Sequence, residues 1–239
     1  MAERKRLTTK QEEIVAKRGM FVVKACPGSG KTFAVAARFA QLLQDWPHAH
    51  RGIAAISFTN VAWQEIERAL SMDLRVKTPV VYPHFLGTID SFVNQHIFLP
   101  FGHLVIPCDH RPELIGPPVN SWEPIGSPYT WGAGECYKRE CKLNELSYDL
   151  SGNLINVLKS RSGIFQNCPR NHDRCSALKK RVVKAGYATQ RDAVHFGVRV
   201  LEEYPAVAKA IVSRFPFLMM DEAQDTSACE MRLVELLSR

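Results

Sequence analysis

The first hundred residues alternate between short apolar runs and longer segments with helical spacing. Phe21–Val23 and Ile53–Ile56 are continuous apolar runs, which are typical of strands buried on both faces of a sheet. Val80–Leu86 is a third strand candidate, and Phe217–Met220 is a fourth one much later in the chain. We therefore predict strands at these four positions.

Helical spacing of apolar residues follows the first of these runs, from Thr32 to about Asp45. Asn60 can cap a second helix that extends to about residue 70, and another helix is expected to begin near residue 90. The helical pattern returns over residues 192–215. Alternating strands and helices predict an α/β fold, a parallel sheet with helices on both faces.

Residues 100–186 have a different character, because they are rich in Pro, Gly, Trp and Cys and lack clear periodicity. We interpret them as an inserted subdomain, mostly helical or irregular. The predicted domain organisation is therefore a core domain formed by residues 1–99 and 187–239, interrupted by this insertion.

Composition places the chain among ordinary globular proteins, with 46% apolar and 23% charged residues. No apolar run reaches the roughly 20 residues that cross a bilayer, and no apolar segment follows the basic start. We expect a cytoplasmic protein without a membrane partner. The net charge of +7 favours a polyanionic partner such as nucleic acid, although it could also serve solubility alone.

Seven cysteines are present, and without an export signal we expect them to be free thiols. A subset in the middle of the chain could surround zinc or an iron–sulfur cluster: Cys136, Cys141, Cys168, His172 and Cys175. Their spacings match no standard ligand pattern, so we expect no metal centre there.

A glycine-rich turn, Ala25–Thr32, lies between the first predicted strand and the first predicted helix. Its glycines let backbone N–H groups point at phosphate oxygens, with a helix N-terminus behind them. Lys31 can reach the β- and γ-phosphates, and the Thr32 hydroxyl can ligate Mg²⁺. This turn predicts a P-loop that binds ATP.

An acidic cluster, Asp221-Glu222-Ala223-Gln224-Asp225, directly follows the fourth predicted strand. Ligands of parallel sheets bind at the carboxyl ends of the strands, where the P-loop also falls. Asp221 could hold Mg²⁺ there, and Glu222 could polarise the water that attacks the γ-phosphate.

The order of these motifs resembles the first RecA-like domain of the UvrD/Rep-type superfamily 1A DNA helicases. Ala25–Thr32 is similar to their motif I, and Asp221–Thr226 to their motif II, which reads D-E-x-Q-D/N-T. Leu7–Gln11 resembles the Q motif. Ser57–Ala62 and Gly87–Phe92 resemble motifs Ia and Ib.

The resemblance implies a P-loop NTPase (RecA-like) fold that uses ATP and Mg²⁺. It implies catalytic roles for Lys31, Glu222 and Gln224, and metal ligation by Thr32 and Asp221. The implied nucleotide contacts are Gln11, Pro27, Gly28, Ser29, Gly30, Lys31, Thr32, Phe33 and Arg38. Gln11 would recognise adenine, although Thr8-x-x-Gln11 is also a helix capping box, and both roles can hold.

Single-stranded DNA is the partner that the resemblance implies for motifs Ia and Ib, through Phe58, Thr59, Asn60, Thr88 and Asp90. The sequence departs from the family at three places, which weakens these expectations for DNA and adenine. Val61 replaces a common Lys and Asp90 a common His, while Phe33 replaces an Arg that often follows the motif I Thr.

We therefore expect the motor domain of an ATP-dependent 3′–5′ DNA helicase or translocase, with the polarity taken from the resemblance. Nothing before Arg239 resembles the second RecA-like domain, so we expect a fragment that hydrolyses ATP weakly or not at all unaided. A nuclease or repair partner would suit bacterial members, which serve repair, recombination or anti-phage defence. The alternative is a nucleotide-dependent binding module without helicase activity; a P-loop kinase is disfavoured by the acidic cluster.

Overall fold

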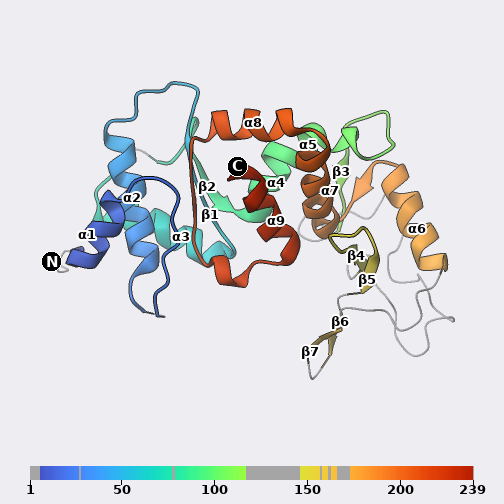
Figure 1. The fold of residues 1–239 in the computed structure, drawn as a ribbon, viewed down its shortest axis with the longest axis horizontal. Coiled ribbons are helices and arrows are strands. Elements are labelled where there is room, and N and C mark those ends of the chain that lie inside the picture. The colour runs from blue at the N-terminus through green and yellow to red at the C-terminus, as the bar shows by residue number, and fades with distance from the viewer. Residues whose placement is uncertain are drawn as a thin grey trace. The chain divides into compact units, whose positions relative to one another are not determined.

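The computed structural model describes residues 6–26, 28–76, 79–116, 146–156, 158–160, 163–165 and 173–238 (Figure 1). Internal contacts divide the chain into two units. The first unit comprises residues 1–92 and 210–226, and the second comprises residues 93–209 and 227–239. The domain boundaries expected from the sequence stay a prediction.

A three-stranded parallel sheet forms the centre of the first unit, in the order β2-β1-β9. Strand β1 (Ile53–Ser57) lies in the middle and is buried along its whole length. It pairs with β2 (Phe85–Thr88) on one side and with β9 (Phe217–Met220) on the other. Because the strands are parallel, all three carboxyl ends face the same edge, as the sequence pattern predicted.

In the first unit α2 (Lys31–Gln44) and α3 (Asn60–Arg68) pack on this sheet, and α1 (Thr9–Ala16) packs on α2. Helix α3 continues into a π-helical turn, Ala69–Asp73. Phe33 and Phe39 of α2, Ile53 of β1 and Ile66 of α3 share one hydrophobic core. Two helices, α4 (Ile89–Val93) and α8 (Pro205–Arg214), each have residues in both units.

The strand predicted at Phe21–Val23 is wrong, because these residues form no strand. Apolar β-branched residues adopt a strand only when a neighbouring strand completes their hydrogen bonds. No described strand pairs with this segment, and Met20 and Val22 are 82% and 83% exposed. The Phe21 ring instead lies beneath the cationic groups of Lys17 and Arg38, at 5.2 and 5.1 Å.

Two other boundaries differ from the sequence pattern for local reasons. Strand β2 begins only at Phe85, because Pro83 has no N–H for a ladder and the His84 N–H closes a turn onto the Val81 carbonyl at 2.9 Å. Helix α3 is capped by Thr59, one residue before the predicted Asn60, through the Thr59 hydroxyl and the Ala62 N–H.

The second unit is organised around α7 (Gln190–Glu203), most of whose residues are buried. Helix α9 (Ala228–Leu237) and a π-helical turn, Asn94–Phe98, pack against it. Gly197 of α7 permits the close approach of Val93 at the end of α4, since a Cβ on Gly197 would lie 3.1 Å from the Val93 side chain. The Pro205 ring starts α8, so the helical pattern over 192–215 is two helices.

Short strands accompany the helices of the second unit, so its described part is less helical than expected. Strands of two or three residues are too short to leave a period in the sequence. The remaining elements are α5 (Leu99–Phe101), a 3₁₀ turn (Gly102–Leu104), the parallel pair β3 (Glu113–Leu114) and β8 (Tyr187–Ala188), the antiparallel pairs β4 (Leu146–Tyr148) with β5 (Leu154–Asn156) and β6 (Leu158–Ser160) with β7 (Gly163–Phe165), and α6 (Asp173–Lys184).

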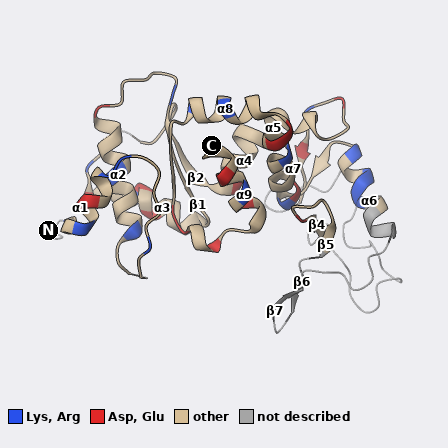
Figure 2. Ribbon diagram, viewed as in Figure 1, with Lys and Arg blue, Asp and Glu red and all other residues tan. Residues whose placement is uncertain are grey.

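Helix α6 carries a run of three basic residues, 179–181 (Figure 2). Lys180 and Arg181 are exposed, but Lys179 is fully buried. Its ammonium forms an ion pair of 2.7 Å with Asp192 of α7 and donates to the Leu146 carbonyl of β4. Among the described residues, no helix is both long and apolar enough to span a membrane.

Candidate nucleotide and nucleic-acid site

The glycine-rich turn leads directly into α2, which begins at Lys31. Gly28 and Gly30 have φ of +76° and +77°, values that glycine adopts without steric cost. The Lys31 ammonium donates to the carbonyls of Ala25 and Cys26, at 3.1 and 3.2 Å, so it folds over the turn. Pro27 lies outside the described residues. The predicted residues thus form a turn whose N–H groups and ammonium could receive phosphates.

Gln11 connects α1 to this turn. Its Oε1 accepts the Thr8 N–H at 2.9 Å, which completes the predicted capping box. Its Nε2 donates to the carbonyls of Ser29 and Gly30, at 3.1 and 3.4 Å. The capping role is therefore confirmed, and the same amide lies against the P-loop. The adenine contact of Gln11 stays a prediction.

Two further residues predicted to contact the nucleotide, Arg38 and Phe33, contact other parts of the protein in the structure. Arg38 donates to the carbonyls of Ile14 and Val15 at the end of α1, and burial lowers the pKa of its guanidinium. Phe33 is only 4% exposed and packs in the core. Their contacts with nucleotide stay predictions, and their visible function is to join α1 to α2 and α2 to the sheet.

The acidic cluster follows β9 and has two unlike carboxylates. Asp221 is 4% exposed, and its backbone N–H extends the sheet by donating to the Ile56 carbonyl at 2.9 Å. Glu222 is half-buried and has φ of +59°, a left-handed conformation that costs a residue with a Cβ about 1–2 kcal/mol. Such strain in the backbone is concentrated at functional sites.

Asp221 has the unmatched acceptor that a metal site requires. Its Oδ1 accepts the Glu222 N–H at 3.1 Å, whereas its Oδ2 is buried without a hydrogen-bond partner. A buried carboxylate oxygen without a donor is costly unless a cation or an ordered water satisfies it. Carboxylate and hydroxyl oxygens are also the ligands that Mg²⁺ prefers. Asp221 therefore fits the metal role predicted for it.

Motif Ia begins where β1 ends, and its three predicted DNA contacts, Phe58, Thr59 and Asn60, are exposed. Phe58 shows 39% of its surface, unusual for a residue that directly follows a buried strand. The Thr59 hydroxyl lies 3.4 Å from Glu222 Oε2. This contact joins motif Ia to motif II, and the motifs alone did not predict it.

Motif Ib begins at the end of β2. The Thr88 and Ser91 hydroxyls lie 2.7 Å apart, and each also accepts the other residue's backbone N–H, at 3.2 and 3.1 Å. Thr88 thereby caps α4, and Asp90 stands in the first turn of that helix. Its predicted DNA contacts stay predictions.

The predicted residues thus form two groups. Gln11 lies with the P-loop, and Thr59 lies with Glu222, but no hydrogen bond or ion pair among the described residues joins Lys31 or Thr32 to Asp221. Gln224 is exposed and donates to Asp225 at 3.2 Å. Both Asp221 and the P-loop belong to the first unit.

Several classes of protein could bind a nucleotide at a site of this kind, and comparison with known proteins identifies the family. The UvrD/REP helicase N-terminal domain matches residues 7–102 and 135–239. The chain belongs to this family. The match includes both the P-loop and the acidic cluster, so the family predicted from the motifs is confirmed.

Individual relatives of this UvrD/REP-type chain are similar over shorter stretches. The Gabija protein GajB of Bacillus cereus (strain VD045) is 36% identical over 91 residues, which are 38% of this chain and 17% of that protein. An ATP-dependent helicase/nuclease subunit of Streptococcus thermophilus (strain ATCC BAA-491 / LMD-9) is 47% identical over 47 residues, 20% of this chain and 4% of that protein. The matched stretches therefore span a small part of each relative.

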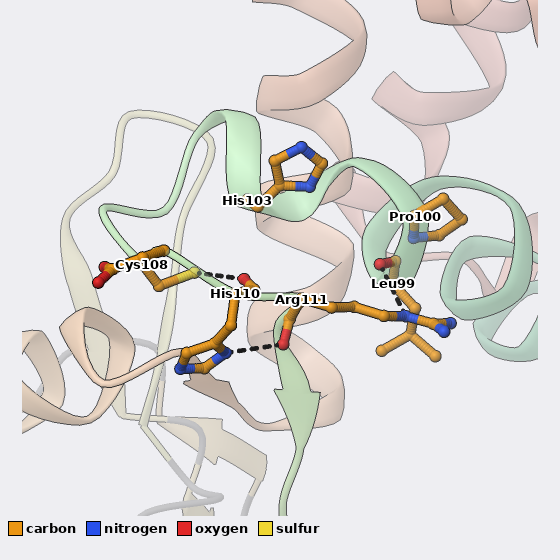
Figure 3. Close-up of a pocket in the computed structure, with 7 residues that line it drawn as sticks. Leu99, Pro100, His103, Cys108, His110 and Arg111 are labelled. Carbon is orange, nitrogen blue, oxygen red and sulfur yellow. Dashed lines mark hydrogen bonds between the residues drawn. The ribbon is translucent and has the colours of Figure 1, made fainter.

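A cavity of about 450 Å³ lies in the second unit of this UvrD/REP-type chain, and its lining includes none of the predicted site residues (Figure 3). Leu99, Pro100, His103 and Arg111 line it, with Cys108–His110. Arg111 extends toward Leu99 and donates from Nε to its carbonyl at 3.1 Å. Despite the imidazoles and the thiol, no group of His, Cys, Asp and Glu in the described residues is arranged to hold a metal.

The mid-chain metal candidates fall elsewhere. Cys136, Cys141, Cys168 and His172 lie outside the described residues, and Cys175 lies in α6, where its side chain is not described. The expectation that they hold no metal stays a prediction.

Proposed function

We propose that this chain is the ATP-binding motor domain of an ATP-dependent 3′–5′ DNA helicase or translocase that acts on single-stranded DNA. The observation that carries the proposal is the contact between the motif Ia loop and Glu222 at the end of adjacent strands. A motor must connect its nucleic-acid contacts to its hydrolytic site, and here the two candidate loops are in contact.

The described geometry supports a proposed role for each nucleotide-binding residue. The P-loop N–H groups and Lys31 would bind the phosphates, and Gln11 would contact the adenine edge from the first turn of α1. Asp221 and Thr32 would hold Mg²⁺, which when bound neutralises charge that develops on the phosphates. Glu222 would accept a proton from the attacking water.

Single-stranded DNA would lie across the carboxyl edge of the sheet. Phe58 is exposed enough to stack on a base, which is worth about 1–3 kcal/mol per base in proteins of this kind. Thr59 and Asn60 are exposed beside it and could bond phosphates. Thr88 and Asp90 would contact the DNA further along the same single strand.

We infer the partners from the family. A second RecA-like domain would supply arginines that complete the hydrolytic site, a contribution of about 10³–10⁵ in turnover in related NTPases. A nuclease is a further candidate partner, since one relative is named as part of a helicase/nuclease. Repair, recombination and anti-phage defence are the pathways in which such a motor would serve.

The test is a titration with ATP and Mg²⁺ together with turnover, each with and without single-stranded DNA. Lys31→Ala is expected to abolish nucleotide binding, whereas Lys24→Ala, an exposed lysine before the turn, serves as its matched control. Glu222→Gln should bind ATP normally and lose DNA-stimulated hydrolysis once a second RecA-like domain is present. Binding that DNA never stimulates into hydrolysis would favour a nucleotide-dependent binding module, and unchanged affinity in Lys31→Ala would refute the P-loop.

A further inference from the structure

The Thr59 hydroxyl takes part in two hydrogen bonds with different functions. Its oxygen accepts the Ala62 N–H at 3.2 Å, which caps α3. Its single proton is donated to Glu222 Oε2 at 3.4 Å. A hydroxyl has only one proton to donate, so any other acceptor that bonds Thr59 must displace Glu222.

The sheet fixes the positions of both partners. Ile56 of β1 lies opposite Met220 of β9 in the parallel register. Thr59 follows Ile56 by three residues, and Glu222 follows Met220 by two, so their side chains emerge from neighbouring strand ends. The left-handed backbone at Glu222 restricts the direction of its carboxylate further.

The bond is easily exchanged. At 3.4 Å it is longer than the 2.5–2.7 Å of a strong hydroxyl–carboxylate bond, so its contribution is small. Thr59 is exposed to solvent, and a strand phosphate could therefore reach it and form a shorter, stronger bond.

We propose that Thr59 is a positioning residue that senses DNA, and this inference rests on the proposed function. Without DNA, Thr59 holds Glu222 and occupies the carboxylate oxygen that would accept a proton from water. When a phosphate of the DNA accepts the hydrogen bond from the Thr59 hydroxyl in place of Glu222, the Glu222 carboxylate is released to act on the attacking water. The helix cap on Ala62 is compatible with both states, because it uses the hydroxyl oxygen.

The experiment is a double-mutant cycle on the affinity for a fluorescein-labelled oligothymidylate, measured by anisotropy in the full chain. Glu222→Ala frees the Thr59 proton and also removes a negative charge. The same substitution in a Thr59→Val chain removes the charge alone. We expect Glu222→Ala to tighten binding more in the Thr59 chain than in the Thr59→Val chain, with a coupling of about threefold or more.

Two variants separate this coupling from simple loss of the cap. Thr59→Ser keeps both bonds and should restore the coupling of the parent. Thr59→Gly keeps a residue that is well tolerated at a helix N-cap but has neither a proton to donate nor a charge, so its chain should fold and show no coupling. Ser227→Ala, which removes the equivalent cap of α9, should leave the coupling intact.

The outcomes are distinct. Additive effects of Glu222→Ala and Thr59→Val, or a coupling that Thr59→Gly retains, would overturn the sensing role, while DNA binding by the parent would still support the proposed function. If the parent chain does not bind the oligonucleotide, both the sensing role and the proposed function fall.

Discussion

Two adjacent carboxylates after β9 show how far neighbouring residues can differ in their physical state. Asp221 is buried and keeps one oxygen without a donor, whereas Glu222 has an unfavourable backbone conformation and contacts Thr59. The motif already predicted a metal role for Asp221 and a proton-accepting role for Glu222, and the structure adds the physical difference between them, which no spacing specifies.

The backbone strain at Glu222 can be measured by comparing two substitutions. Both Glu222→Ala and Glu222→Gly remove the carboxylate, but only glycine relieves the cost of φ at +59°. We expect Glu222→Gly to be more stable than Glu222→Ala by about 1 kcal/mol in urea unfolding. Equal stability of the two variants would show that the left-handed conformation is not present in solution.

His84 introduces a pH dependence into the first unit. Its Nδ1 accepts the N–H of Ile53, the first residue of the central strand, at 3.2 Å, so this nitrogen must be unprotonated. Burial, and next the charge of Arg214, lower the pKa of His84. A lowered folded-state pKa means that the unfolded chain binds the proton more readily, so stability falls as pH drops below the unfolded value of about 6.5.

We therefore expect the thermal midpoint to decrease between about pH 7 and pH 5, in part through His84. His84→Asn can keep an acceptor that does not titrate, and it should flatten this decrease. His50→Gln, at an exposed histidine, is the control and should leave the slope as in the parent. A slope unchanged by His84→Asn would contradict the prediction.

Among the elements, β1, α2 and β9 were predicted with nearly the observed bounds, because each has a strong period or an uninterrupted apolar run. Phe21–Val23 has the same local signal but forms no strand, since a strand depends on a partner that local sequence does not specify. The short strands of the second unit left no signal to find.

The Lys179–Asp192 pair joins three elements of the second unit, α6, β4 and α7, with no exposed side-chain surface on either partner. Burial lowers the pKa of Lys179 and Asp192 opposes this effect. Lys179→Met leaves the Asp192 charge buried without its cation, and we expect a loss of about 3–5 kcal/mol in the free energy of unfolding.

Lys179→Met combined with Asp192→Asn should recover much of this loss, because the amide oxygen can still accept the Thr189 N–H that Asp192 accepts at 2.9 Å. Arg199→Met, in the exposed Arg199–Glu203 pair, is the matched control and should cost less than about 1 kcal/mol. Urea unfolding monitored by circular dichroism measures all three variants. A small effect of Lys179→Met alone would show that this pair is hydrated in solution.

At the scale of the whole molecule, nucleotide binding should be visible as stability. A ligand that binds only the folded chain adds about 2.7 kcal/mol at a concentration one hundred times its dissociation constant. We expect ATP with Mg²⁺ to raise the thermal midpoint of the parent chain and not that of Lys31→Ala. Inorganic phosphate is the control for binding by charge alone, and an equal rise in Lys31→Ala would place the nucleotide elsewhere.

The site itself could be predicted from the sequence only as separate motifs. Residues within one turn, such as Gly28–Thr32, are fixed by their spacing. The contact between Thr59 and Glu222 spans 163 positions and depends on the register of two parallel strands, which no local pattern specifies. The burial of Lys179 could not be predicted for the same reason. A run of basic residues is typical of an exposed helix face, and the sequence does not show that Asp192 lies close enough to pair with Lys179.

The position of β9 in the described sheet affects how the chain would behave at high concentration. β9 pairs with β1 on one side, and no described strand pairs with its other side, while Phe217 is 39% exposed. An unpaired edge of this kind is a template on which another polypeptide can add a strand. Pairing with β1 positions Asp221 through the Ile56 carbonyl. We expect the opposite side of β9 to be where a strand from another copy of the chain would add at high protein concentration.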